Sequence, residues 1–353
     1  MISLRFYRIF DTGRVIDLDL LERELARSYF TARASFLRVN PKSIIMEDPP
    51  LMLKMHAVSV EREGTVFNLD VIARVYDIGA ISICFAFEDP LAPSSSLVET
   101  ALLFAGQECL KDLFHTYLKN IGEILSPYMS GLSIESDFYE DYTIYVTDQI
   151  DKTIDPAVLL SGERINFSPQ IHEEILKNTL SYTTDDVAIL SWDSALLCNP
   201  ENPTDLIDLI EFASVQVLEL RYYDRVLTRQ MVKMYDDIEQ ADKMAQFRKM
   251  GKYHAIMAQL MESYAEISEI TEKINNLIKV TEDVYYAKAY ATVLKVMRSS
   301  QWSEGVDRKI EVIHKNYSML SEEVRIQHSN FLEWVIIVLI AMEFILAIWK
   351  SAQ

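Results

Sequence analysis

The sequence predicts an α+β or α/β amino-terminal domain, then a long helical hairpin or coiled-coil region, and one carboxy-terminal transmembrane helix. Three observations lead to this fold class. Short β-rich segments accompany a long helical segment over residues 1–200, apolar residues recur with heptad-like spacing over 203–330, and an apolar stretch fills 331–349. A chain of 353 residues has room for one sizeable domain and an elongated second region.

Composition is typical of an ordered protein that makes no direct contact with nucleic acid. The chain is 50% hydrophobic and 25% charged, and its 9 glycines and 10 prolines argue against long disordered linkers. A net charge of −19 repels phosphate backbones, and no basic patch in the sequence offsets it. The three cysteines are far apart and lie in apolar runs, which favours free thiols in a reducing compartment.

Strand signals dominate the first part of the domain. The segment after Glu61-Arg62-Glu63-Gly64 is β-rich, as is the segment before it, so we expect a hairpin with its turn near Gly64. The further strands are expected at residues 2–6, 79–87, 142–146 and 186–190. The strand order does not follow from these signals.

A long helix is expected over residues 97–125. Ser96 and Glu99 have the spacing of a capping box, in which each side chain satisfies a free backbone N–H at the start of a helix. Pro127 marks the end of the helix, since proline cannot continue a helical hydrogen-bond ladder.

Helix is the predicted structure from Asn202 onward. Asn202 fits an N-cap, Pro203 fits the first helical position, and apolar residues then recur in alternating steps of four and three. The stretches at 206–238 and 253–278 are expected to pair as an antiparallel hairpin. A third seam is an expected oligomerisation surface, although the core of a helix bundle within one chain has the same spacing. Its residues are Val306, Ile310, Ile313, Tyr317, Leu320 and Val324.

Residues 331–349 are the predicted membrane anchor. As a helix they would span about 28 Å, close to the roughly 30 Å of a hydrocarbon core. Trp334 and Trp349 stand near the two ends, where indoles favour the interface, and Glu343 stands near the middle. About a dozen apolar side chains at roughly −0.3 to −0.6 kcal/mol each outweigh one central acid costing roughly +3 kcal/mol. A buried helix in a soluble oligomer is the alternative, because the uninterrupted apolar run, 334–342, is short.

The topology follows from the absence of other targeting signals. Residues 1–10 lack the apolar core and cleavage site of a signal peptide, so we expect the large amino-terminal part to remain in the cytoplasm. If the helix inserts, Glu343 is expected to be protonated and to hydrogen-bond between the helices of a homo-oligomer.

No catalytic residue, cofactor or metal site is predicted. The glycines form no phosphate-binding loop, and His172 lacks the second histidine of a helical zinc motif. Ser191-Trp192-Asp193-Ser194 lacks the glycines of a nucleophile elbow, so Trp192 is expected in the core. The polar and aromatic residues from Glu219 to Arg225 are expected to form an ion-pair network that fixes helix register.

Three stretches resemble the family named for being required for meiotic nuclear division, the Rmd-type proteins. They are residues 75–81, 217–223 and 330–348, the last including Glu343. The resemblance implies an α/β domain, a helical region, a tail-side membrane helix and self-association. In the mitochondrial branch it also implies an anchoring role in organellar translation, without established catalytic residues. The chain has no transit peptide, so a bacterial cytoplasmic membrane is the expected setting.

The sequence therefore predicts a non-enzymatic, membrane-anchored and self-associating scaffold or adaptor. Its expected partners are membrane lipid, further copies of the chain and a protein not identified by the sequence. The alternative is an enzyme of unrecognised class that uses acidic residues of the α/β domain.

Overall fold

The computed structural model shows two compact units. It describes residues 1–13, 15–25, 31–33, 44–45, 48–129, 134–149, 151, 153–244, 246–276, 279–280 and 284–351. Unit 1 contains Met1–Tyr222 and Glu272–Ser303, and unit 2 contains Tyr223–Thr271 and Glu304–Gln353.

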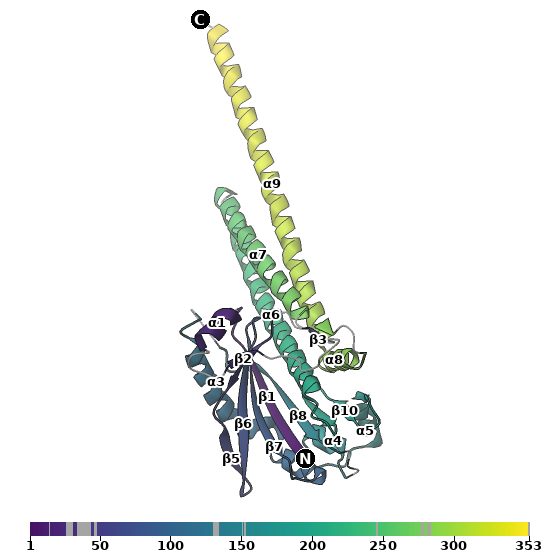
Figure 1. Ribbon diagram of the computed structural model, residues 1–353. Helices are drawn as coiled ribbons and strands as arrows, with labels where there is room; N and C mark the ends of the chain where they lie inside the picture. Colours follow the sequence, from purple (N-terminus) through teal and green to yellow (C-terminus); the bar gives the residue numbers. More distant parts are fainter. Residues whose placement is uncertain are drawn as a thin grey trace. The chain divides into compact units, whose positions relative to one another are not determined.

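Most strands of the first two hundred residues come in runs, β2 to β7 and β9 to β11, with helices between the runs, and long helices follow (Figure 1). The strands are β1 (Ile2–Asp11), β2 (Thr31–Arg33), β3 (Ile44–Ile45), β4 (Leu51–Lys54), β5 (Val58–Arg62), β6 (Thr65–Val75), β7 (Ala80–Asp89), β8 (Tyr139–Thr147), β9 (Thr179–Leu180), β10 (Val187–Leu190), β11 (Ser194–Cys198) and β12 (Lys279–Val280). The α-helices are α1 (Leu18–Leu25), α2 (Leu97–Leu102), α3 (Lys111–Leu125), α4 (Pro156–Ser161), α5 (Pro169–Leu176), α6 (Thr204–Asp242), α7 (Gln246–Asn275), α8 (Val284–Val296) and α9 (Ser299–Ser351). Two short 3₁₀ helices, Ser94–Ser96 and Ala105–Leu110, flank α2.

One mixed sheet organises unit 1. Its order is β2-β4-β6-β7-β1-β8-β11-β10-β9, with β5 paired to β6 outside this path. Strands β8 and β11 run parallel, and the other pairs among the described strands are antiparallel. This sheet and the long helices after it confirm the predicted fold class.

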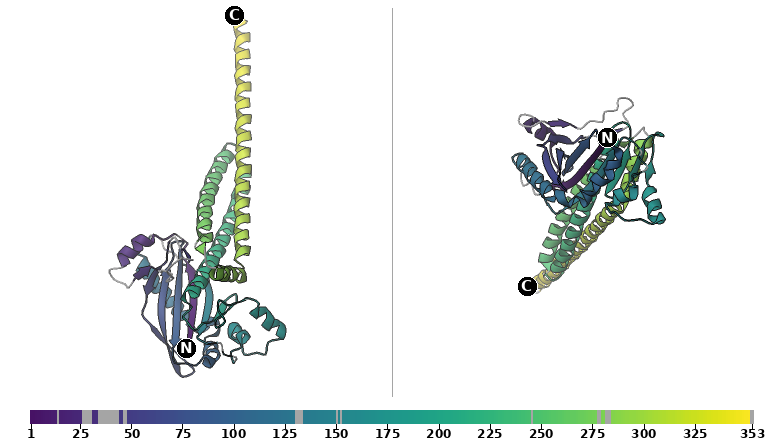
Figure 2. Two further views of the ribbon diagram at one scale, coloured as in Figure 1. Left: turned by 45° about the vertical axis from the view of Figure 1, so that its right-hand side comes forward. Right: turned by 90° about the horizontal axis from the view of Figure 1, so that it is seen from below.

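Helices cover both faces of the sheet. Alternate residues of β1 point to opposite faces, so Phe6 packs on one core and Tyr7 on the other. Helices α2 and α3 lie over the Phe6 face, whereas α8 and the first half of α6 lie over the Tyr7 face (Figure 2).

The first half of α6 belongs to the core of unit 1. Every residue from 206 to 220 is buried, whereas the sequence placed the start of a separate helical region at 203. A helix buried all round carries no polar stripe that faces solvent. Because its burial comes from the sheet and from α8, the helical period alone does not show which unit it joins.

The prediction of one continuous helix over residues 97–125 is wrong, because the structure has two separate helices there, α2 and α3. Gly106 has φ +68° and Gln107 has φ +55°, so the chain turns between α2 and α3. The expected capping box is also wrong, since the Ser96 hydroxyl donates to the Pro93 carbonyl oxygen at 2.8 Å and makes no cap bond. The predicted hairpin is confirmed as β5–β6, with Glu63 and Gly64 both at positive φ.

Unit 2 contains the second half of α6 and most of α7 and α9. Lys252 Nζ lies 2.6 Å from Asp237 Oδ1, and Tyr253 Oη donates to Asp242 Oδ1 at 2.6 Å. These contacts join α6 to α7 on either side of their connection, as the predicted antiparallel hairpin requires. Lys309 Nζ, on α9, lies 2.6 Å from Asp224 Oδ1 and ties α9 to α6.

Candidate functional site

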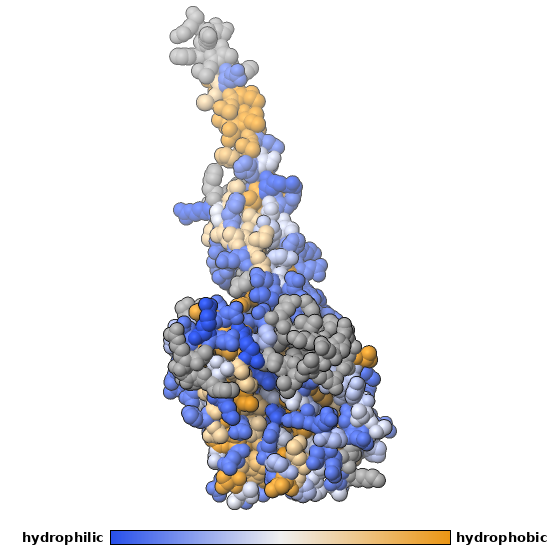
Figure 3. Space-filling view, in the orientation of Figure 1, coloured by the Kyte–Doolittle hydropathy of each residue, from blue (hydrophilic) through white to orange (hydrophobic). Residues whose placement is uncertain are grey.

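The carboxy-terminal part of α9 is an apolar helical segment whose side chains are exposed. Among the described residues, α9 is the helix that is long and apolar enough to cross a membrane, and none of its most apolar window is buried. Trp334 is 66% exposed and Ile340 is 60% exposed, and Figure 3 shows hydrophobic side chains gathered along this part of the helix. Glu343 is also exposed. Trp349 lies in α9, but its side chain falls outside the part of the chain that the structure describes.

The expected oligomerisation seam packs within the chain. Val306, Ile313 and Leu320 are buried in unit 2, and Ile310, Tyr317 and Val324 are partly buried. The spacing of these residues therefore matches the core of a helix bundle inside one chain, which was the second reading of the pattern.

A buried ion cluster joins the sheet to α6. Arg74 Nη1 donates to Glu211 Oε2 at 2.6 Å and lies 2.8 Å from Asp208 Oδ1, and Tyr76 Oη donates to Glu211 Oε1 at 3.1 Å. Burial raises the pKa of the Glu211 carboxyl, while the Arg74 guanidinium opposes that rise. The cluster holds α6 in register on the sheet, because each partner left alone would be a buried charge.

Glu219 is a second buried acid on α6, two turns further along the helix. Its side chain is fully buried, no cation pairs with it among the described residues, and the Asp11 carboxyl lies beside it. Burial raises the pKa of Glu219 well above its usual value, and the nearby Asp11 carboxyl raises it further. The expected ion-pair network is therefore not continuous here. Arg221 pairs with Glu140, and Asp224 pairs with Lys309.

Two of the three cysteines are sealed in the core. Cys84 is 5% exposed and Cys198 is 2% exposed, and Cys109 is partly buried; all three are free thiols. Burial raises the pKa of the Cys84 thiol to about 12 and that of Cys198 to about 11. Both therefore remain protonated at neutral pH.

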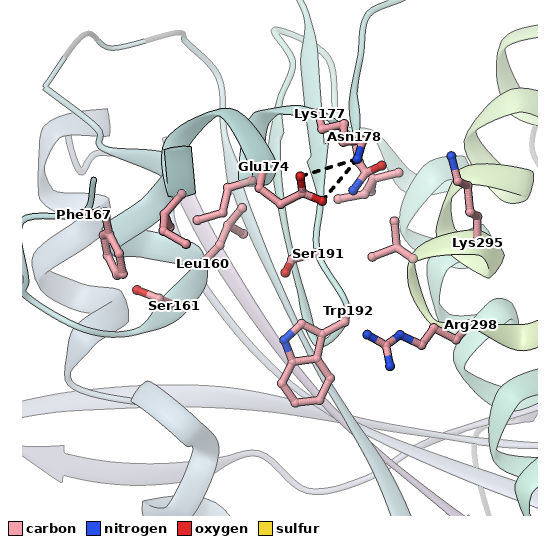
Figure 4. Close-up of a pocket in the computed structure, with 14 residues that line it drawn as sticks. Leu160, Ser161, Phe167, Glu174, Lys177, Asn178, Ser191, Trp192, Lys295 and Arg298 are labelled. Atoms are coloured by element: carbon pink, nitrogen blue, oxygen red, sulfur yellow. Dashed lines mark hydrogen bonds and ion pairs between the residues drawn. The ribbon is translucent and has the colours of Figure 1, made fainter. Parts of the chain in front are cut away.

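A cavity of about 550 Å³ opens in unit 1 beside Trp192. Figure 4 shows Leu160, Ser161 and Phe167 on one side of it and Lys295 and Arg298 on the other. The Glu174 carboxylate accepts a hydrogen bond from Lys177 Nζ at 3.3 Å. Ser191 and Trp192, from the β10–β11 turn, form the floor between the two sides.

Sequence reasoning placed Trp192 wrongly. The side chain is 66% exposed, because the β10–β11 turn, closed by the Ser191 N–H donating to the Ser194 carbonyl oxygen at 2.8 Å, carries it outward. The sequence signal for this exposure was local: Trp192 stands next to Asp193 between two short strands. Lys295 and Arg298, which line the same cavity, gave no signal, since they lie about a hundred positions away in the sequence.

No group of three His, Cys, Asp or Glu side chains capable of holding a metal ion occurs among the residues described. Glu211 and Glu219, whose pKa values are raised by burial, lie in the core, and the cavity beside Trp192 has one carboxylate in its lining, Glu174.

Comparison with known proteins finds relatives without an assigned activity. The family model described as "Uncharacterized protein MJ0711, N-terminal domain" matches residues 1–204, more than half of the chain. A protein of Methanocaldococcus jannaschii, named "Uncharacterized protein MJ0711", is 28% identical over 228 residues, and the match covers 60% of this chain and 67% of the relative. No solved structure matches the chain.

Proposed function

The chain belongs to the MJ0711 N-terminal domain family and also carries a helix with an exposed apolar segment. From these two facts we propose that the protein is a non-enzymatic, membrane-anchored scaffold or adaptor. Helix α9 crosses the bilayer once. The domain that defines the family is presented to partners by this anchor.

The observation that carries the proposal is the exposure of α9. Large apolar side chains are exposed at nearly every position from Phe331 to Met342. A soluble monomer rarely exposes so large a continuous apolar surface, which makes a bilayer or another chain its natural environment. The whole proposed span, residues 331–349, would be about 28 Å long as a helix, close to the roughly 30 Å of a hydrocarbon core, and its transfer energy remains favourable with Glu343 included.

Self-association is the second part of the proposal. The seam from Val306 to Val324 packs inside unit 2. We therefore assign the contact between copies to the apolar segment at residues 331–349. Glu343 supplies a polar group at membrane depth, and such groups hydrogen-bond to a neighbouring helix.

The buried acids support a scaffold over an enzyme of unrecognised class. Glu211 and Glu219, whose pKa values are raised by burial, are covered by the sheet and by the residues around α6. A substrate must reach a catalytic acid, whereas these two acids lie where they affect folding.

The proposed location is a prokaryotic cytoplasmic membrane, with the large amino-terminal part in the cytoplasm. The archaeal relative widens the expected bacterial setting. Membership of the Rmd-type family and its link to organellar translation stay predictions.

Membrane fractionation tests the anchor. We expect the full chain to sediment with membranes, to resist an alkaline carbonate wash and to require detergent for extraction. A variant that ends at Asn330 is expected in the supernatant as a folded protein. Recovery of the full chain as a monodisperse soluble protein without detergent, unchanged by this truncation, would overturn the proposal.

A pair of point variants distinguishes membrane insertion from non-specific association with membranes. Ile337→Arg places a charge inside the proposed span and costs insertion roughly 3 kcal/mol, so the sedimented fraction should fall. Ile326→Arg makes the same change on the same helix, outside the span, and should leave that fraction unchanged. Equal behaviour of the two variants contradicts a span at residues 331–349.

A further inference from the structure

The cavity beside Trp192 has the size and walls of a ligand site. It is lined by three separate stretches of unit 1: residues 160–178, the β10–β11 turn, and the end of α8. Its volume of about 550 Å³ lies within the roughly 300–1,000 Å³ of small-molecule pockets.

The charge of this cavity opposes the charge of the chain. Its lining has three cations, Lys177, Lys295 and Arg298, and one carboxylate, Glu174. Lys177 forms an ion pair with Glu174, whereas neither Lys295 nor Arg298 forms an ion pair within the described residues. A second cavity, of about 440 Å³, is lined by acids and by no cation. In a chain with net charge −19, two uncompensated cations facing one cavity make a local site for an anion.

The aromatic side chains supply the other half of the site. The indole of Trp192 is largely exposed and faces the cavity from the β10–β11 turn, and Phe167 stands on the far wall (Figure 4). An exposed tryptophan leaves a large apolar ring face unpaired, and a planar ring of a ligand stacks on such a face.

Arg298 is held in an unusual backbone conformation. Its φ of +57° lies in the left-handed region, which disfavours residues other than glycine. The Arg298 N–H donates to the Lys295 carbonyl oxygen at 3.1 Å, and the Arg298 carbonyl oxygen accepts from the Gln301 N–H at 3.0 Å. In Figure 4 its guanidinium extends toward Trp192. Strained residues of this kind concentrate at binding sites, where the surrounding structure fixes them in place.

We propose that this cavity binds a small anion that carries a planar ring. The phosphate or carboxylate of the ligand lies between Lys295 and Arg298, and the ring stacks on Trp192. The site is independent of the membrane anchor, so the two proposals stand or fall separately.

Equilibrium binding to the full chain in detergent tests the site. The probes are AMP and nicotinate, which combine a ring with a phosphate or a carboxylate, and adenosine and inorganic phosphate, which each lack one half. We expect saturable binding of AMP or nicotinate, with quenching of Trp192 fluorescence, and affinity at least about tenfold weaker for adenosine and inorganic phosphate. The stronger of the two ring anions identifies the anionic group that the site prefers.

Variants assign the binding to this cavity. Arg298→Asn removes the guanidinium but keeps a residue that tolerates positive φ, and Trp192→Ala removes the ring face. Each should weaken binding by about tenfold or more. Lys288→Gln removes an exposed cation outside the cavity from α8, the helix that carries Lys295, and should bind like the unaltered chain. Unchanged thermal unfolding of each variant shows that it is folded.

Two results overturn the proposal. One is the absence of saturable binding for both AMP and nicotinate. The other is binding that survives both Arg298→Asn and Trp192→Ala in folded protein, which would place the ligand elsewhere.

Discussion

The Glu219 carboxyl is buried, so neither solvent nor a neighbouring cation stabilises its ionised form. Burial is the largest cause of its raised pKa, and the neighbouring carboxyls of Asp11 and then Asp77 raise it further. Glu219 and Asp11 therefore favour a state with fewer than two negative charges. This differs from the Arg74 cluster on the same helix, in which a guanidinium compensates Glu211 and Asp208.

Replacing Glu219 by glutamine should stabilise the chain in a pH-dependent way. Because the folded-state pKa is raised, the folded chain loses stability as the pH rises from the ordinary range of a glutamate through the raised value. Glutamine does not ionise and escapes this loss. We expect little difference at pH 5 and a gain on the order of 1–3 kcal/mol at pH 8, measured by thermal unfolding of the full chain in detergent.

The control for this prediction is Glu163→Gln. Glu163 is exposed, so its substitution should change stability little at either pH. If Glu219→Gln lowers stability equally at both pH values, the carboxylate is a required hydrogen-bond acceptor and our account of it is wrong.

At the scale of elements, sequence reasoning succeeded where the signal was local. The alternation in residues 2–6 and the Glu63-Gly64 turn predicted β1 and the β5–β6 hairpin. It failed over residues 97–125, because a single glycine is compatible with a helix and nothing local marks Gln107 for positive φ.

The candidate sites also differ in whether a local stretch of sequence predicts them. The apolar segment of α9 was predictable, since hydrophobic length is a property of one contiguous stretch. The cavity beside Trp192 was not, because it exists only once α8 and the β10–β11 turn come together. The burial of α6 likewise depends on the sheet beneath it.

Two glycines near the start and end of short helices should respond differently to alanine. Gly106 has φ +68° with open space around an added Cβ, so Gly106→Ala should cost about 1–2 kcal/mol from backbone strain. Gly162 ends α4 at φ +69°, and an added Cβ would lie 3.1 Å from the Ala105 Cβ. Gly162→Ala should therefore cost more than Gly106→Ala, measured by denaturant unfolding. Equal costs would show that Ala105 shifts freely.

At the scale of the whole molecule, one chain combines a packed α/β unit with an exposed apolar segment at the end of α9. Unit 1 buries its helices against both faces of a sheet, whereas the end of α9 exposes its apolar residues. In the function proposed above, lipid and further copies of the chain surround this segment, and Glu343 supplies the polar group between the copies.

Removing the Glu343 carboxyl should weaken self-association within the membrane. Interhelical hydrogen bonds contribute roughly 1 kcal/mol in bilayers, so Glu343→Ala should shift the equilibrium toward monomer by about fivefold. Glu343→Gln keeps a hydrogen-bonding side chain and should associate more strongly than the alanine variant. Cross-linking in reconstituted vesicles at graded protein density measures this equilibrium.

Glu333→Ala is the matched control for that experiment, because Glu333 stands at the edge of the proposed span, within reach of the headgroups. It should leave the cross-linked fraction unchanged. Association of Glu343→Ala at the level of the unaltered chain would remove Glu343 from the contact between copies.

The sealed thiols of Cys84 and Cys198 bear on how the molecule can be observed. Both stay protonated and shielded at the slightly alkaline pH used for maleimide chemistry, so they react slowly in the folded chain. A cysteine introduced at exposed Lys288 or Ile326 would therefore accept a fluorophore or spin label in preference to them, and Cys109 is the natural residue to replace first. Attached probes could then report distances in detergent and in bilayers while both core thiols are left in place.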